Sequence, residues 1–179
     1  MMNGFIQKID RRSNLPFIPL DEEYSLNLSI MVIIIANMSK NSKGNLVLDM
    51  NKLQVFLYLV KNPSRIISIL NIAGKKNSFI DQQQTYTIKS LSSNVDILYD
   101  NNRIKCLIKK LAFSGVLLAD KIEDNTVKLY LSDKGLALAE KFDGAYFETL
   151  KMLVLAIKPL QSLPASKLNS LLNQVFRGV

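Results

Sequence analysis

The segment "DNNRIKCLIKKLAF", residues 100–113, carries basic side chains at the spacing of a helix. These side chains are the best candidates in the sequence for binding an anionic partner. On a helical wheel centred on Ile104, the neighbouring leucine and isoleucine side chains fall together on one arc. The basic side chains fall on the opposite arc, and they are Arg103, Lys105, Lys109 and Lys110. Cationic groups in this arrangement contact a phosphate backbone, an acidic protein surface or only water, and the residues alone leave all three open.

The residues that enzymatic chemistry needs are not gathered in this sequence. The chain has no histidine, which excludes Ser-His and Cys-His nucleophile pairs and imidazole metal ligands. Its single cysteine, Cys106, has no obvious base beside it, so we interpret it as a small semi-buried residue. No glycine-rich phosphate loop of the GxxxxGK[ST] or GxGxxG type occurs, and the acidic run 21–23 is typical of a helix start. We therefore expect no catalytic activity, cofactor or metal.

The positive charge is concentrated in one region. The formal net charge of the chain is +8, and residues 61–110 contribute +6 of it, with nine lysines and arginines against three aspartates. A regional excess of this kind favours a specific anionic partner over general solubility. Lys75 and Lys76, which follow Gly74, and Lys128 on the predicted hairpin could extend the basic face.

Reading of individual bases is less favoured than contact with the phosphate backbone. Arg103 is the only arginine on the predicted helix, although bidentate arginine is the commonest guanine contact. Asn101 and Asn102 could read adenine, but beside Asp100 they are better interpreted as helix caps. We expect any contact with double-stranded DNA to lack strong sequence specificity.

The bulk composition is that of a globular protein. With 179 residues, 48% hydrophobic and 21% charged, the chain fits one domain, or two small ones sharing a core. The longest apolar run, residues 30–36, is too short to cross a bilayer, and the N-terminal stretch does not have the pattern of a signal peptide. A single cysteine suits a reducing cytoplasm.

The first half of the chain predicts helices. Two prolines make residues 14–20 an extended lead-in, and a long apolar helix follows Asp21, although its β-branched run 30–35 also fits a strand. Helical spacing continues over 49–62, and a shorter helix ends at Gly74. Residues 75–99 show no compact pattern, and a short strand and a partner-facing connection both remain open.

The second half predicts a helix, a hairpin and another helix. The helix 100–114 begins at a cap, either Asp100 or Asn101, and ends at Gly115. Residues 116–122 and 126–132 then flank the turn 123–125, and a helix follows from residue 133. The fold class is therefore mainly α with a small β-hairpin wing, and the ending "YLSDKGLALAEKF" resembles that of winged-helix proteins. We divide the chain into an arm and buried helix (1–48), a winged-helix-like domain (49–143) and C-terminal helices (144–179).

Both ends of the chain offer candidate docking elements. The C-terminal segment 164–179 is an amphipathic helix, and it either docks a partner or packs on its own domain. The residues expected to dock are Leu15, Phe17 and Ile18 in the arm and Leu168, Leu172 and Phe176 in the helix.

Taken whole, the chain resembles the small middle components of bacterial ABC-three-component systems. The resemblance rests on "LPFIPLDEEYSLNLSIMVIII" (15–35), "LDMNKLQVFLYLVKNP" (48–63) and the hairpin-containing half. It implies a non-enzymatic subunit near the heads of an SMC/Rad50-like ATPase, with an effector that is often a nuclease, as in the anti-phage and anti-plasmid Lamassu systems.

Two functions follow as hypotheses. The first is an accessory subunit that links the ATPase and the effector nuclease in the cytoplasm, contacts no membrane and touches the DNA backbone. The alternative is a free-standing dimeric winged-helix transcription regulator, which would prefer one promoter sequence.

Overall fold

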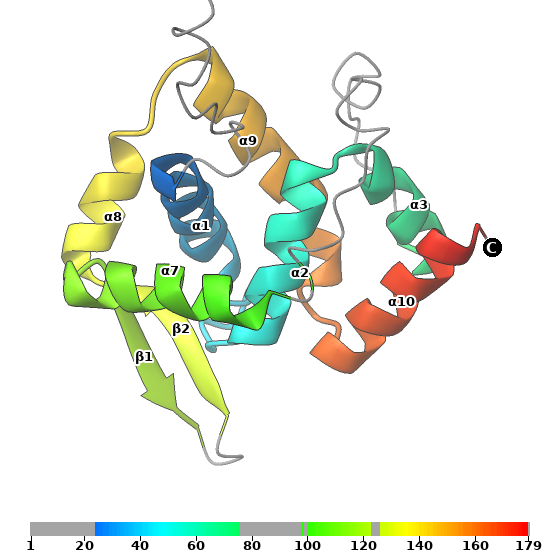
Figure 1. The fold of residues 1–179 in the computed structure, drawn as a ribbon, viewed down its shortest axis with the longest axis horizontal. Coiled ribbons are helices and arrows are strands. Elements are labelled where there is room, and N and C mark those ends of the chain that lie inside the picture. Colours follow the sequence, from blue (N-terminus) through cyan, green and yellow to red (C-terminus); the bar gives the residue numbers. More distant parts are fainter. Residues whose placement is uncertain (1–23, 76–97, 99, 123–125, 179) are drawn as a thin grey trace, which may run out of the picture.

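The computed structural model describes residues 24–75, 98, 100–122 and 126–178. The chain is mainly helical, with a two-stranded antiparallel sheet (Figure 1). In chain order the elements are α1 (Tyr24–Met38), α2 (Met50–Lys61), α3 (Ser64–Ile72), α7 (Asn101–Phe113), β1 (Leu117–Lys121), β2 (Val127–Leu131), α8 (Asp133–Glu140), α9 (Ala145–Ala156), the 3-10 turn η2 (Lys158–Leu160) and α10 (Ala165–Arg177).

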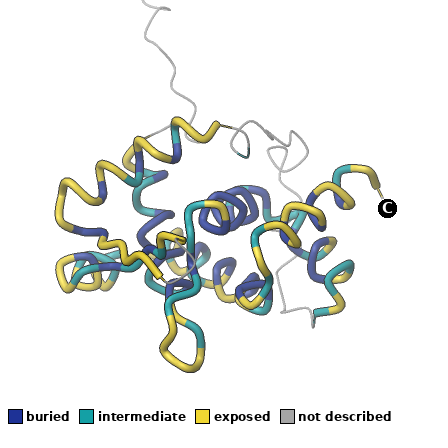
Figure 2. The backbone as a smooth tube through the Cα atoms, turned by 90° about the horizontal axis from the view of Figure 1, so that it is seen from below, coloured by how far each residue is buried: buried dark blue, intermediate teal, exposed yellow. Residues whose placement is uncertain are grey.

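Helix α1 lies at the centre of the molecule. Its residues 30–35 are all buried, and the helix packs against α2, α8, α9, β2 and α7. The helical interpretation of this β-branched run is confirmed, and the strand alternative is wrong. A helix that is apolar on every side requires neighbours all around it, and Figure 2 shows buried backbone gathered in the interior.

Helices α2 and α3 follow the predicted boundaries closely. The Asp49 side chain caps α2 by accepting a hydrogen bond from the Lys52 backbone N–H at 3.0 Å. The helix ends before Pro63, as expected for a residue that disfavours helical backbone ahead of it. Gly74 follows α3 with a positive φ of 63°, and the Lys75 N–H donates to the Leu70 carbonyl, which is the arrangement of a glycine helix end.

The predicted hairpin is confirmed. β1 and β2 pair antiparallel with Leu117 opposite Leu131 and Lys121 opposite Val127. A further backbone hydrogen bond of 2.8 Å runs from the Leu129 N–H to the Leu48 carbonyl, so the segment before α2 lies beside β2. The mainly helical class with a small hairpin is therefore observed.

Gly135 joins the hairpin to α8 by close contact. The Ser132 hydroxyl caps α8 by accepting a hydrogen bond from the Gly135 N–H at 3.1 Å. A Cβ at residue 135 would overlap the Val116 carbonyl oxygen, which itself accepts a hydrogen bond from the Ser132 N–H. Only glycine fits this approach of α8 to the start of the hairpin.

The C-terminal helices complete the same core. α9 covers α1, and α10 lies on α2 and α3, so one hydrophobic cluster draws on all three predicted segments of the chain. The boundaries near residues 48 and 143 stay predictions as domain limits. Leu168 and Leu172 are buried in this cluster, and Phe176 is half-buried against it, as expected if α10 packs on its own domain.

Some predictions concern residues outside the described part of the chain. These are the capping residue Asp21, the arm 14–20 with Leu15, Phe17 and Ile18, and nearly all of 75–99 with Lys76. Among the described helices, none is both long and apolar enough to span a membrane.

We expect Gly135→Ala to destabilise the fold. At an ordinary helical position this change adds up to about 1 kcal/mol of stability. Here the added methyl group meets a backbone carbonyl that cannot rotate away, so the free energy of unfolding should fall by about 2 kcal/mol. Urea denaturation measures whether the free energy of unfolding of Gly135→Ala rises or falls. A rise would contradict the close approach of residue 135 to the Val116 carbonyl.

Candidate functional site

The basic helix α7 presents its charges on the outer arc, as the spacing predicts. Its apolar residues Ile104, Leu107 and Leu111 are buried, and Lys105, Lys109 and Lys110 are exposed. Asp100 is the N-cap, accepting a hydrogen bond from the Arg103 backbone N–H at 2.9 Å. One detail differs from expectation, because Cys106 is exposed rather than semi-buried.

The lysines of α7 are not equivalent. The Lys110 ammonium lies 5.0 Å from the centroid of the Tyr24 ring, in a cation–π contact that holds it against the start of α1. The Tyr24 hydroxyl also lies 3.8 Å from the Cys106 Sγ. Lys105 and Lys109 stand one turn apart with no hydrogen bond or ion pair to any described side chain. They are therefore the most available cations of this surface.

The predicted extensions of the basic face lie apart from α7. The Lys128 Nζ is 3.2 Å from Asp49 Oδ2, and each of the two side chains is only 16% exposed. Its charge is thus compensated within the fold instead of facing outward. Lys75 follows α3, which packs against α2 and α10. Among the described residues predicted for the basic face, the structure gathers the four on α7 and leaves Lys75 and Lys128 on other parts of the chain.

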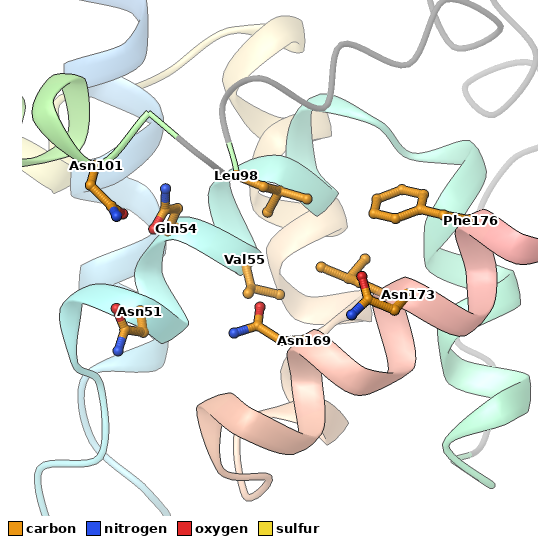
Figure 3. Close-up of a pocket in the computed structure, with 9 residues that line it drawn as sticks. Asn51, Gln54, Val55, Leu98, Asn101, Asn169, Asn173 and Phe176 are labelled. Atoms are coloured by element: carbon orange, nitrogen blue, oxygen red, sulfur yellow. The ribbon is translucent and has the colours of Figure 1, made fainter.

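A second surface is a groove of about 380 Å³ between α2, the start of α7 and α10 (Figure 3). It contains the predicted docking residues Leu172 and Phe176, and the Phe176 ring meets the Tyr58 ring edge to face at 5.7 Å. The polar residues of its lining are all carboxamides, and they are Asn51, Gln54, Asn101, Asn169 and Asn173.

The chemistry of this groove is neutral and polar. A carboxamide both donates and accepts hydrogen bonds, so five of them beside apolar side chains suit an extended peptide backbone better than a charged ligand. Sequence patterns do not predict the groove, because its lining comes from α2, the start of α7, α10 and Leu98, which are far apart along the chain. The only local signal was the pair Asn169 and Asn173, one turn apart beside Leu172 and Phe176.

The described residues contain no cluster of three or more histidine, cysteine, aspartate or glutamate side chains that could hold a metal ion.

Asp49 is the residue on which the start of α2 and the hairpin both depend. We expect Asp49→Ala to lower the free energy of unfolding by about 2 kcal/mol, since it removes a helix cap and the partner of Lys128. Asp49→Asn keeps an oxygen acceptor for the cap and should cost about half as much. Asp143→Asn, at an exposed position, is the control, and equal losses for Asp49→Ala and Asp143→Asn would contradict the assignment.

The Asp49→Asn loss should also depend on pH. Burial lowers the pKa of Lys52 below 10.5, Lys128 lowers it further, and Asp49 opposes both effects. Between the folded pKa and 10.5 the unfolded chain binds more protons, so stability rises with pH in that window. Removing the Asp49 charge extends the window to lower pH. The deficit of Asp49→Asn in urea denaturation should therefore be larger at pH 7 than at pH 10, and a deficit that grows with pH would contradict this.

A protein-family model described as ABC-three component (ABC-3C) system Middle Component 4 matches residues 38–170, a span that runs from the end of α1 into the first half of α10 and contains α2, α7 and the hairpin. No curated protein and no solved structure matches.

Proposed function

The chain belongs to the Middle Component 4 family of ABC-three-component systems, and from this premise we propose that it is a non-enzymatic accessory subunit of a bacterial defence complex. The family match over residues 38–170 is the observation that carries the proposal. The two described surfaces, one basic and one rich in carboxamides, are of the kind that a connecting subunit needs.

We further propose that the subunit links an SMC/Rad50-like ATPase to an effector nuclease in an anti-phage or anti-plasmid system of the Lamassu type. The arm at residues 14–20 and helix α10 are the proposed docking elements. Because Leu168 and Leu172 belong to the core, a partner at α10 would meet the carboxamide rim of the groove and the half-buried Phe176.

The described elements support a winged-helix interpretation. α1 packs on both α2 and α7, the segment ending at Leu48 lies beside β2, and α7 immediately precedes the hairpin. In helix-turn-helix proteins the recognition helix lies in the major groove. We propose that Lys105 and Lys109 contact the phosphate backbone of DNA, with little choice of sequence because α7 has one arginine.

Assembly with a neighbouring subunit is the first test. The protein should co-elute with the SMC-like ATPase subunit of its own system in size-exclusion chromatography. The double variant Asn169→Arg/Asn173→Arg places two charged side chains on the groove rim and should weaken this association at least tenfold. The matched control, Ser170→Arg/Gln174→Arg, changes exposed positions of α10 that do not line the groove.

Either of two results would contradict this proposal. A protein that elutes alone as a stable homodimer and prefers one promoter sequence at fixed salt would support the transcription regulator instead. Equal weakening by the rim and control variants would remove the groove from the interface.

Backbone contact is the second test. Lys105→Glu/Lys109→Glu should lower the affinity for random-sequence duplex DNA at least tenfold and reduce the slope of log affinity against log salt by about 2. Lys110 is left unchanged because it packs on Tyr24. The control Lys141→Glu/Lys167→Glu has the same net charge and alters exposed residues of other elements. An affinity lowered equally by both variants would show only a general charge effect.

A further inference from the structure

A third surface feature, separate from the basic face of α7 and from the carboxamide groove, is a depression lined by lysines. It has a volume of about 540 Å³ and lies where the turn after α1, the first turn of α2 and η2 meet. Its lining holds three ammonium groups and no carboxylate, and comprises Lys40, Asn41, Ser42, Val47, Lys52, Lys158, Pro159, Gln161 and Ser162.

Lys52 is the least exposed cation of the depression. Its side chain is only 7% exposed, and its Nζ donates to the Gln161 carbonyl at 3.0 Å. An ammonium carries three N–H donors, so this bond uses one of them. The nearest carboxylate, Asp49, is already paired with Lys128 at 3.2 Å. A buried ammonium whose counter-ion is shared with a second lysine is stabilised by any anion that enters beside it.

The rim adds donors and no competing acid. Lys40 and Lys158 are exposed and form no ion pair with the described residues. The Asn41 Oδ1 accepts from the backbone N–H groups of Lys43 and Asn45 at 2.9 and 3.0 Å, which leaves its NH₂ group as a donor.

The walls are held together before any ligand arrives. The Gln161 Nε2 donates to the carbonyls of Met38 and Lys40 at 2.8 and 3.0 Å, and so fastens η2 to the end of α1. A site whose walls and one of whose ammonium groups, Lys52, are already positioned loses less conformational entropy on binding than one that must first assemble.

We propose that this depression, the lysine pocket formed by Lys40, Lys52 and Lys158, binds a phosphoryl group. Three lysines lining one depression, with hydroxyl and amide donors beside them, suit the multiple charge of a phosphate better than the single charge of a carboxylate. A recessed ammonium is reached by a protruding group, which favours a free oligophosphate or a terminal 5′-phosphate over the flanks of a DNA duplex. The site goes beyond the proposed subunit role and does not depend on it.

Binding can be measured by calorimetry at constant ionic strength, with pyrophosphate and with 5′-phosphorylated or 5′-hydroxyl oligonucleotides as probes. Saturable binding of pyrophosphate or of the phosphorylated oligonucleotide is expected, and Lys40→Gln/Lys158→Gln should weaken it at least tenfold. Lys141→Gln/Lys167→Gln, with the same loss of charge at exposed positions, should not. The two probes distinguish a free oligophosphate from a nucleic-acid end.

Lys52→Gln supplies a second readout. The variant should lose pyrophosphate binding while remaining folded by circular dichroism, because burial disfavours the charge that it removes. If Lys52→Gln does not fold, the rim variant decides the matter alone. Lys40 and Lys158 each follow the end of a helix, where lysines also compensate the helix dipole. The proposal would be overturned if the rim and control variants bound pyrophosphate equally well, or if the unaltered protein showed no saturable binding. Lys40 and Lys158 would then serve only to compensate the helix dipoles.

Discussion

The burial of α1 is the constraint on which the remaining structure depends. Residues 30–35 form an uninterrupted apolar turn and a half, so no face of this helix can be left to solvent. Each such side chain contributes about 2 kcal/mol when it is buried. The covering elements come from both directions of the chain, with α2 close in sequence and α8 and α9 more than ninety residues away. The basic surface, the groove and the lysine pocket all lie on elements whose positions this helix determines.

Short sequence patterns predicted the individual helices and strands well. They did not predict which elements that are distant in sequence pack together. Asp49, Asp100 and Gly115 mark helix ends through bonds within a few residues, so their roles could be read from the sequence. The choice of helix over strand for residues 30–35 rested on the length of the segment and on its acidic start at 21–23, and it was correct. The arrangement of the helices around α1 required contacts between distant segments, which periodicity does not encode.

The candidate sites show the same division. The outward arc of α7 follows from helical spacing alone. In contrast, Lys128 was expected to face a partner, and its pairing with Asp49 joins residues 79 positions apart. The lysine pocket combines Lys40 and Lys52 with Lys158. No pattern in the sequence indicates that these three charges meet, because it is the Gln161 amide that fixes η2 against the end of α1.

The close contact at Gly135 determines how the hairpin can behave mechanically. Its base is held on one side by the end of α7 and on the other by the cap of α8, with the Val116 carbonyl shared between them. From Leu118 outward β1 is exposed, and the outer end of the hairpin projects from the body of the molecule (Figure 1). The base of the hairpin is thus attached to α7 and α8 together, and the Leu129 N–H attaches β2 to the segment before α2 as well. A displacement of this base would therefore disturb the end of α7 and the start of α8 at the same time.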